Sequence, residues 1–311
     1  MKNSRSAYFG ILLLAMITAR AYAEQPVIDM HVHTKNVVQA GPEHAENLAT
    51  MYAYEAEADE NNVVLFTASG AQDFVESWSN YFGDRMLGGA TFPCVNGVTN
   101  YEGATDGRRP CFSSGGAFPD LEWLRTQYER GQLKVMGELG MQYAGIAFND
   151  ERMAPYYRMA QELGVPVAFH TSGGPPRTAE RCCPGFRLAI GDPEQLEEVL
   201  VRYPGLRVQV MHGNVLTYPG LLRMLQQYPN VYVDLTPFST ILPREGFHQM
   251  LRSYRMHGLL DRIMFATDDF PVAETIAAFQ SADFLTEEEL GGILCGNAER
   301  FLNMEGICKS L

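Results

Sequence analysis

The sequence predicts an α/β protein, a single (β/α)8 barrel, from three observations. Short apolar runs rich in β-branched residues alternate with longer amphipathic stretches after residue 24, and this alternation favours a parallel sheet covered by helices. A chain of 311 residues can hold eight such units, because barrels of about 250 residues form as one domain. Polar residues also gather where the expected strands end, which is where barrels place their functional sites.

The expected elements follow one another regularly along the chain. Strands are expected at 27–33, 63–68, 86–92, 133–138, 165–170, 206–212, 231–235 and 263–268. Helices are expected at 46–60, 72–82, 120–131, 151–163, 193–202, 217–227, 244–257 and, in pieces, 272–302.

Turn residues and loop lengths agree with this order. Gly164, Tyr203-Pro204-Gly205 and Tyr228-Pro229-Asn230 each separate a helix from the next strand, as is typical of helix-to-strand turns. The two long loops, 93–119 and 171–191, follow strands. We expect both to rise over the carboxyl ends of the strands and to shape a substrate pocket.

The first 23 residues are predicted to be a cleaved signal peptide. Lys2 and Arg5 precede an apolar run at 8–18, and Ala21-Tyr22-Ala23 matches the small-x-small pattern of signal peptidase sites. The run is shorter than the roughly 20 residues that span a bilayer. The sequence therefore predicts a periplasmic or secreted protein in which residues 24–311 form one domain without stable membrane insertion. Arg20, close to the cleavage site, leaves an uncleaved tether open.

Charge and cysteine content narrow the class of protein. Removal of the signal takes away three basic residues and no acid, which changes the formal charge from −13 to −16. Because no basic patch offsets this acidity, a nucleic-acid partner is not expected. We expect a small-molecule substrate as partner, and a homo-oligomer stays open. Six cysteines fit an oxidising compartment; Cys94 with Cys111 and Cys295 with Cys308 are candidate pairs. The connectivity is left open among Cys94, Cys111, Cys182, Cys183, Cys295 and Cys308.

The stretch Val27–His33 carries the first sign of a metal site. A strand alternates its faces, so Asp29, His31 and His33 are expected to share one face. A buried histidine pair alone is explained by hydrogen bonds, but later strands end in further ligand-type residues, Glu138, His170, His212 and Asp268. Four of the seven histidines thus join two carboxylates, a donor set suited to Zn²⁺ and acceptable to Mn²⁺, Fe²⁺ or Co²⁺.

The pattern resembles the amidohydrolase superfamily of metal-dependent barrel enzymes, in particular its amidohydrolase-2 branch. The resemblance covers essentially the whole chain after the signal. It rests on the Asp-x-His-x-His strand, Gly137-Glu138-Leu139-Gly140, the single histidines of strands five and six, Thr267-Asp268-Asp269-Phe270-Pro271 and the closing segment 296–302.

The resemblance implies a role for each of these residues. His31, His33 and Asp268 would hold one divalent ion, and His170 with His212 would hold or face a second. Glu138 would bridge them, at the position that many relatives fill with a carboxylated lysine. Asp268 would act as proton acceptor and donor, and His212 would stabilise a developing oxyanion.

The expected reaction is hydrolysis of an ester, lactone or amide by a metal-activated hydroxide. One alternative is a decarboxylase or hydratase of the same branch that uses a single metal ion. Another is a metal-binding barrel that has lost catalysis. The substrate is not readable, because fold and metal do not determine the pocket.

Several further residues have two interpretations. Asp29 either orients a ligand histidine or forms hydrogen bonds in the barrel floor. Tyr143, Arg177 and Arg181 are candidate substrate contacts, although loop arginines are as commonly solvated. Asp269 is interpreted as a structural carboxylate.

Overall fold

A computed structural model describes residues 25–34, 42–93, 117–174, 176–181 and 183–309, without the side chains of 42–50 and 181. The predicted signal peptide at 1–23, most of the loop 93–119 and the candidate pair Cys94 and Cys111 lie outside the described residues.

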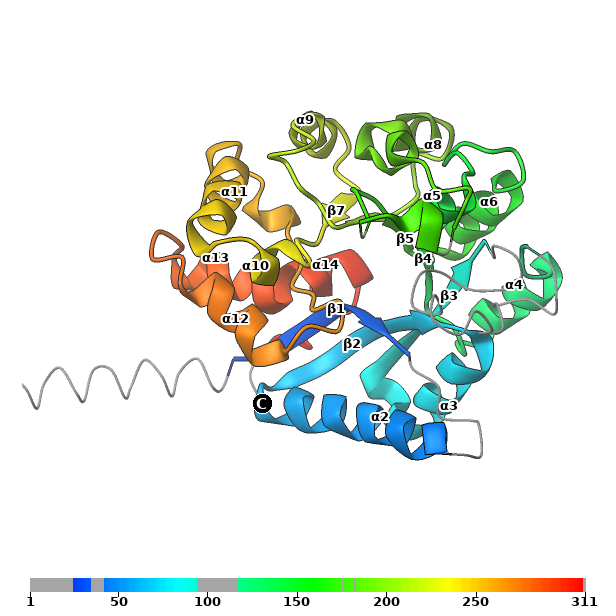
Figure 1. Ribbon diagram of the computed structural model, residues 1–311, viewed down its shortest axis with the longest axis horizontal. Helices are drawn as coiled ribbons and strands as arrows, with labels where there is room; N and C mark the ends of the chain where they lie inside the picture. Colours follow the sequence, from blue (N-terminus) through cyan, green and yellow to red (C-terminus); the bar gives the residue numbers. More distant parts are fainter. Residues whose placement is uncertain (1–24, 35–41, 94–116, 175, 182, 310–311) are drawn as a thin grey trace, which may run out of the picture.

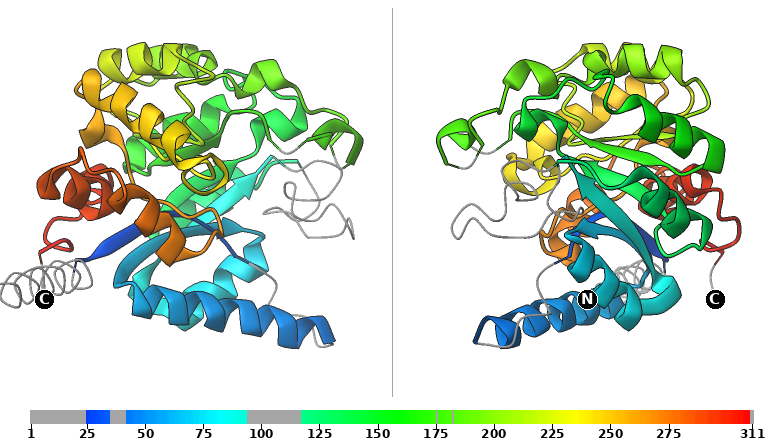
Figure 2. Two further views of the ribbon diagram at one scale, coloured as in Figure 1. Left: turned by 60° about the vertical axis from the view of Figure 1, so that its left-hand side comes forward. Right: turned by 90° about the vertical axis from the view of Figure 1, so that its right-hand side faces the viewer.

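Seven parallel strands form one sheet in chain order and curl into a barrel, with the helices on its outside (Figure 1). The two views of Figure 2 show the helices around the strands from other sides. This confirms the predicted fold class. The strands are β1 (Val27–His33), β2 (Val63–Gly70), β3 (Met86–Phe92), β4 (Val135–Leu139), β5 (Val167–His170), β6 (Val208–Met211) and β7 (Val231–Val233).

The expected eighth strand at 263–268 does not form regular sheet. The segment nevertheless lies between β7 and β1, because the Met264 N–H donates to the Val233 carbonyl (2.8 Å) and the Phe265 carbonyl accepts from the Met30 N–H (3.0 Å). The Phe265 N–H instead donates to the Ile293 carbonyl (2.9 Å). This diversion interrupts the ladder, so the segment closes the barrel through isolated backbone contacts.

The long helices lie close to their expected positions, and their ends have identifiable causes. Asp120 caps α4 by accepting from the Trp123 N–H at 2.8 Å, and Gly164 ends α6 in the left-handed conformation (φ 67°), which glycine adopts without strain. The α-helices are α2 (Pro42–Glu60), α3 (Gln72–Phe82), α4 (Leu121–Glu129), α5 (Met141–Ala144), α6 (Ala154–Leu163), α7 (Thr178–Arg181), α8 (Glu197–Arg202), α9 (Gly220–Gln227), α10 (Phe238–Ile241), α11 (Arg244–Met256), α12 (Val272–Gln280), α13 (Glu287–Gly291) and α14 (Asn297–Leu302). Short 3-10 turns lie at Gly83–Arg85, Leu188–Gly191, Pro193–Leu196 and Leu260–Arg262, and a π-helical turn lies at Gly292–Gly296.

The alternation of β1 departs from the prediction. The pairing of β1 with β2 is irregular between Asp29 and Val32. Met30 packs in the cluster inside the barrel, whereas Asp29 accepts a hydrogen bond from the Tyr54 hydroxyl of α2 (3.3 Å). Asp29 therefore does not share the face of His31, because an irregularity of this kind shifts the side-chain alternation.

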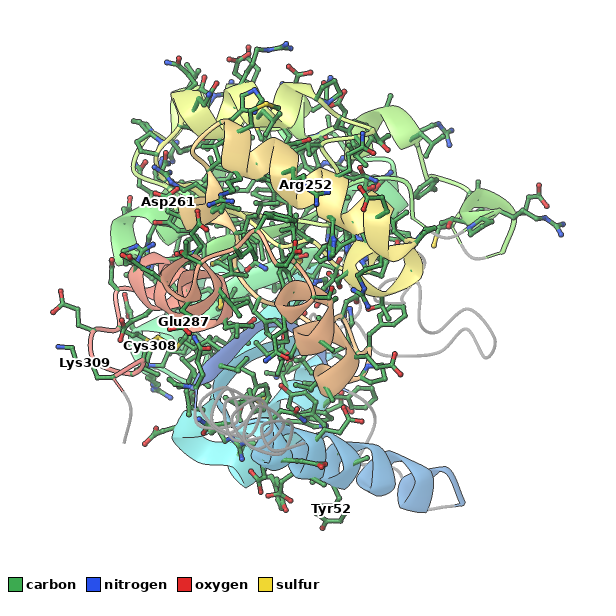
Figure 3. The ribbon with its side chains drawn as sticks, turned by 90° about the vertical axis from the view of Figure 1, so that its left-hand side faces the viewer. Tyr52, Arg252, Asp261, Glu287, Cys308 and Lys309 are labelled. Atoms are coloured by element: carbon green, nitrogen blue, oxygen red, sulfur yellow. A yellow bond between two sulfur atoms is a disulfide. The ribbon has the colours of Figure 1, made fainter. Side chains whose placement is uncertain are left out.

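Apolar side chains fill two layers on either side of the strands. One cluster fills the barrel interior with Ile28, Leu65 and Val135 among its members, and a larger one joins strands to helices. The outer surface carries charged side chains such as Arg252 and Asp261 (Figure 3). None of the described helices combines the length and hydropathy of a membrane-spanning helix.

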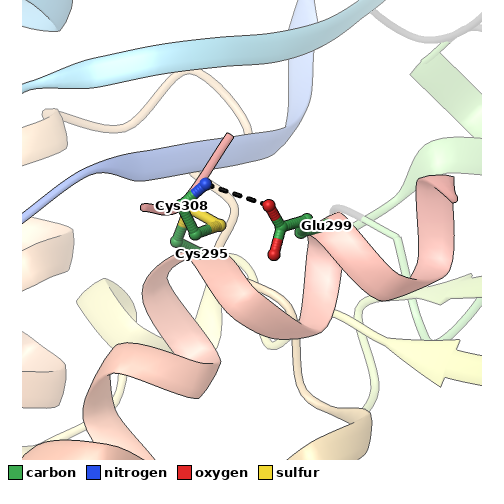
Figure 4. The surroundings of a disulfide bond; sticks show 3 residues. All are labelled: Cys295, Glu299 and Cys308. Atoms are coloured by element: carbon green, nitrogen blue, oxygen red, sulfur yellow. Dashed lines mark hydrogen bonds between the residues drawn. A yellow bond between two sulfur atoms is a disulfide. The ribbon is translucent and has the colours of Figure 1, made fainter. Parts of the chain in front are cut away.

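Cys295 and Cys308 form a disulfide with Cα atoms 5.8 Å apart (Figure 4), as one of the candidate pairings proposed. Glu299 of α14 accepts a hydrogen bond from the Cys308 N–H (3.0 Å). The bond fixes the C-terminal segment against the turn that precedes α14.

Candidate metal centre

The fold brings all six predicted ligands together at the carboxyl ends of the strands. His31 and His33 end β1, Glu138 lies in β4, and His170 ends β5. His212 directly follows β6. Asp268 follows the segment that closes the barrel, where its N–H donates to the His31 carbonyl (2.8 Å). Three groups of these side chains have the spacing of metal ligands: His31, His33 and Asp268; Glu138, His170 and His212; and His31, His212 and Asp234.

One oxygen of Glu138 faces the first group. The Nε2 atoms of His31 and His33 lie 3.7 and 3.5 Å from Glu138 Oε2. The same nitrogens lie 3.5 and 3.1 Å from Asp268 Oδ1. Four donor atoms from three parts of the chain thus converge on one point.

The other oxygen of Glu138 faces the second group. His170 Nδ1 lies 2.6 Å and His212 Nε2 lies 3.6 Å from Glu138 Oε1, and the two nitrogens are 3.1 Å apart. His212 Nδ1 lies 2.8 Å from the Thr236 carbonyl. Since a carbonyl only accepts, Nδ1 carries the proton and Nε2 presents a lone pair to the site.

These distances fit divalent cations. Ligand bonds of 2.0–2.1 Å in a tetrahedron place neighbouring donor atoms roughly 3.4 Å apart, and the separations within both groups scatter around that value. His31 Nε2 is also buried and has no hydrogen-bond partner among the described residues. Such an atom is costly unless something binds it, so the residues present suit a bound metal ion.

Gly137 is required for the position of Glu138. Its φ of 138° lies in a region that L side chains rarely adopt, and a Cβ there would lie 2.4 Å from the Ala168 carbonyl oxygen. The glycine therefore lets β4 approach β5 closely while it directs Glu138 into the site.

Two site residues other than glycine also have left-handed backbones, His212 (φ 61°) and Asp268 (φ 51°). Such conformations cost on the order of 1–3 kcal/mol and occur where function constrains the chain. The His212 N–H donates to Asp234 Oδ1 (3.1 Å), so a buried carboxylate stabilises one of these turns.

The carboxylates of the site are ionised. Burial raises the pKa of Glu138, but the hydrogen bond from His170 and the nearby imidazoles of His212 and His31 outweigh burial and hold its pKa well below the usual value. Burial likewise raises the pKa of Asp268, and the charges of the nearby histidines overcome this and lower its pKa to about 2. Asp268 is therefore available to accept a proton at neutral pH.

Asp234 is the residue that the sequence prediction missed. It is fully buried after β7 and accepts hydrogen bonds from the Gln209 side chain (2.9 Å) and the Thr236 hydroxyl (2.8 Å). Its Oδ2 also lies 3.6 Å from His31 Nδ1. Since its oxygens already accept several hydrogen bonds, we interpret it as a carboxylate that orients His31 rather than as a ligand. The sequence did contain a signal for Asp234, since this polar residue directly follows the apolar strand Val231–Val233.

Asp29 and Asp269 act on the backbone of the β1 histidines. Asp29 accepts hydrogen bonds from the Thr267 hydroxyl (2.6 Å) and from the N–H groups of Thr267 (3.0 Å) and His31 (3.2 Å). Burial raises its pKa to about 7 although these hydrogen bonds lower it. Asp269 Oδ1 accepts from the His33 N–H (3.1 Å). Both carboxylates fix β1 to the segment that closes the barrel, and neither of these bonds involves an imidazole ring.

A cavity of about 760 Å³ opens onto the ligand groups. Tyr143 lines it, and its ring packs 4.6 Å from that of His170; its role as a substrate contact stays a prediction. Several residues of the loop after β5 also line it, including Ser172 and Leu188, which agrees with the role expected for 171–191.

The arginine predictions have different outcomes. Arg177 does not line the cavity; its side chain is 75% exposed and pairs with Glu180 (2.7 Å). That prediction is not supported, because the turn at Arg177 points its side chain to solvent. The side chain of Arg181 lies outside the described residues.

Comparison with known proteins identifies the family. The family model described as amidohydrolase, of the amidohydrolase-2 type, matches residues 28–304. The chain belongs to this amidohydrolase family. No curated protein matches the sequence significantly.

Solved structures show the same amidohydrolase barrel at low identity. An uncharacterised TIM-barrel protein from Bordetella bronchiseptica is 18% identical (TM-score 0.61; 89% of this chain, 98% of that one). A probable 2-pyrone-4,6-dicarboxylic acid hydrolase from Acinetobacter baumannii is 14% identical (0.57; 89% and 99%). A dihydroxybenzoic acid decarboxylase from Polaromonas with bound manganese is 13% identical (0.57; 91% and 98%). At these identities the likeness shows the fold alone.

Proposed function

We propose that this chain is an exported metal-dependent hydrolase that cleaves an ester, lactone or amide bond. The observation that carries the proposal is the position of Glu138 between two ligand groups, with one carboxylate oxygen facing each. A bridging carboxylate of this kind suits a pair of divalent ions, which is a common arrangement for hydrolysis. We propose zinc as the metal because the donors are imidazoles and carboxylates, with manganese, iron and cobalt as alternatives.

The proposed reaction assigns a task to each side chain. His31, His33 and Asp268 would hold one cation, His170 and His212 the second, and Glu138 both. Bound cations lower the pKa of water towards about 7 and polarise a carbonyl.

Asp268 acts as the general base and then as the acid. Its carboxylate accepts a proton from water as the new C–O bond forms, and it passes that proton to the leaving oxygen or nitrogen as the scissile bond breaks. The predicted role of His212 as an oxyanion donor is not supported by this geometry, because its Nδ1 proton is donated to the Thr236 carbonyl and its Nε2 presents a lone pair to the site.

The alternative of a decarboxylase or hydratase would need a single ion, and Glu138 would then have no bridging task. A catalytically inactive metal-binding barrel would not need an ionised Asp268 beside the ligands. The experiment below separates these alternatives from the proposal: bound metal with no turnover of any substrate would indicate the inactive barrel.

Metal analysis of the purified protein, with a hydrolysis screen beside it, tests the proposal. We expect about two divalent ions per chain, fewer in Glu138→Ala, and two in the control Glu162→Ala, whose carboxylate is on the surface of α6. The screen covers lactones, esters and acylated amines with added Zn²⁺ or Mn²⁺, beside decarboxylation of hydroxybenzoates. One tightly held ion that Glu138→Ala leaves unchanged, together with decarboxylation, would overturn the proposal.

Export is tested separately by expression of the full chain in a bacterial host. We expect the protein in the periplasm or medium with an N-terminus at Glu24 by mass spectrometry. Cytoplasmic protein that keeps its first 23 residues would refute this part.

A further inference from the structure

Exposed apolar side chains gather at the mouth of the cavity. Leu188, in the loop after β5, is 62% exposed, and Ile241, at the end of α10, is 56% exposed; both line the cavity. Leu216, 45% exposed, lies between the lining residues Asn214 and Thr217. The loops after β5 and β7 therefore each place one large apolar side chain at this mouth, and the loop after β6 carries an exposed leucine next to lining residues in the sequence.

The wall below the mouth is also largely apolar. Phe74, Phe238 and Phe270 line the same cavity as Glu138 and Asp268, so one continuous space joins the ligand groups to the rim. Its volume of about 760 Å³ is that of a site for a drug-sized ligand. It is therefore far larger than an ester or amide group alone requires.

Outside the metal centre, the polar groups that the described residues place on this wall are neutral. Thr217, Tyr218 and Asn214 offer hydroxyl and amide groups, and the carboxylates among the described lining residues, Glu138 and Asp268, belong to the metal centre. A ligand that binds to a rim of this composition gains free energy because apolar surface is buried, and not because charges pair.

We propose that the substrate is a neutral ester or lactone with an apolar acyl chain, and that Leu188 and Ile241 contact this chain. The inference rests on the proposed hydrolysis for the scissile bond, whereas the chain site rests on the rim and wall alone. Full burial of a methylene group strengthens binding about fourfold. Affinity is therefore expected to rise with chain length until the chain passes the rim.

Binding of n-alkanols, from butanol to decanol, measures this site without any cleavage. By calorimetry on the purified protein we expect the dissociation constant to fall up to about fourfold for each added methylene group. In the double variant Leu188→Ser/Ile241→Ser, the change in dissociation constant between successive longer alkanols should fall to about twofold or less. Val201→Ser is the matched control, because Val201 is 63% exposed on α8 and does not line the cavity; its steps should equal those of the unmodified protein.

The two proposals fail in different ways. Affinity that does not depend on chain length, or steps that the double variant leaves unchanged, would overturn the chain site. Chain-length-dependent binding without cleavage of any p-nitrophenyl ester from acetate to decanoate supports the chain site and counts against hydrolysis. If the chain site and hydrolysis are both correct, kcat/KM for these esters rises with the length of the acyl chain, and the double variant reduces that rise.

Discussion

Asp234 Oδ2 lies 3.6 Å from His31 Nδ1, on the opposite side of the imidazole ring from the Nε2 that faces Glu138 and Asp268. A carboxylate in this position keeps the proton of the ring on Nδ1 and leaves Nε2 free to bind a cation. Burial raises the pKa of Asp234, but the nearby imidazoles of His31 and His212 and the hydrogen bond from the His212 N–H more than compensate and lower it.

The first prediction follows from this contact. Asp234→Asn keeps the shape of the side chain but removes its charge, and the loss of such a partner typically weakens metal binding by about 10–100-fold. Competition with a chelator measures the affinity. Asp261→Asn, at an exposed carboxylate, is the control and should change nothing. Unchanged affinity in a folded Asp234→Asn would show that His31 is oriented by other contacts.

The second prediction concerns Gly137. Gly137→Ala should lower the free energy of unfolding by about 2–5 kcal/mol, because it adds backbone strain and a clash with the Ala168 carbonyl. It should also reduce the metal content, since Glu138 must move. Urea unfolding and metal analysis measure the two effects.

Gly164→Ala separates strain from the clash. Gly164 has a φ of 67° with nothing within 4 Å of an added Cβ, so this variant should cost only about 1–2 kcal/mol and keep its metal. Equal losses in the two variants would contradict the importance of the β4–β5 contact.

The convergence of the six side chains could be predicted from the sequence because they lie at or near the ends of short apolar strands, and parallel strands of a barrel end at one face. The same signal marks Asp234 after Val233, but a lone carboxylate at a strand end has many structural uses. The irregularity of β1 beyond Asp29 and the diversion of Phe265 towards Ile293 were not predictable. Both depend on backbone contacts between segments that are distant in the sequence, and a periodic pattern contains no information on them.

The third prediction concerns the Cys295–Cys308 disulfide, which joins two residues 13 positions apart in the sequence. In the chain-entropy account a loop of this size stabilises the folded state by about 3 kcal/mol. In urea unfolding, Cys295→Ala/Cys308→Ala should therefore show a free energy of unfolding lower by about 3 kcal/mol. Its metal content should be unchanged, because neither cysteine belongs to the ligand groups. Equal stability of the variant and the unmodified protein would mean that packing of α14 alone holds this segment.

The last prediction concerns Asp268, whose carboxylate is ionised and lies 3.1 Å from His33 Nε2. Asp268→Asn keeps an oxygen donor in place but cannot accept a proton. We expect metal content to be retained and kcat to fall by about 10²–10⁴-fold, the usual contribution of a general base. Steady-state kinetics on any ester or lactone that the screen identifies, beside metal analysis of the same sample, measure both quantities. Retained turnover would exclude Asp268 as the base, whereas loss of the metal with the activity would assign it to coordination alone.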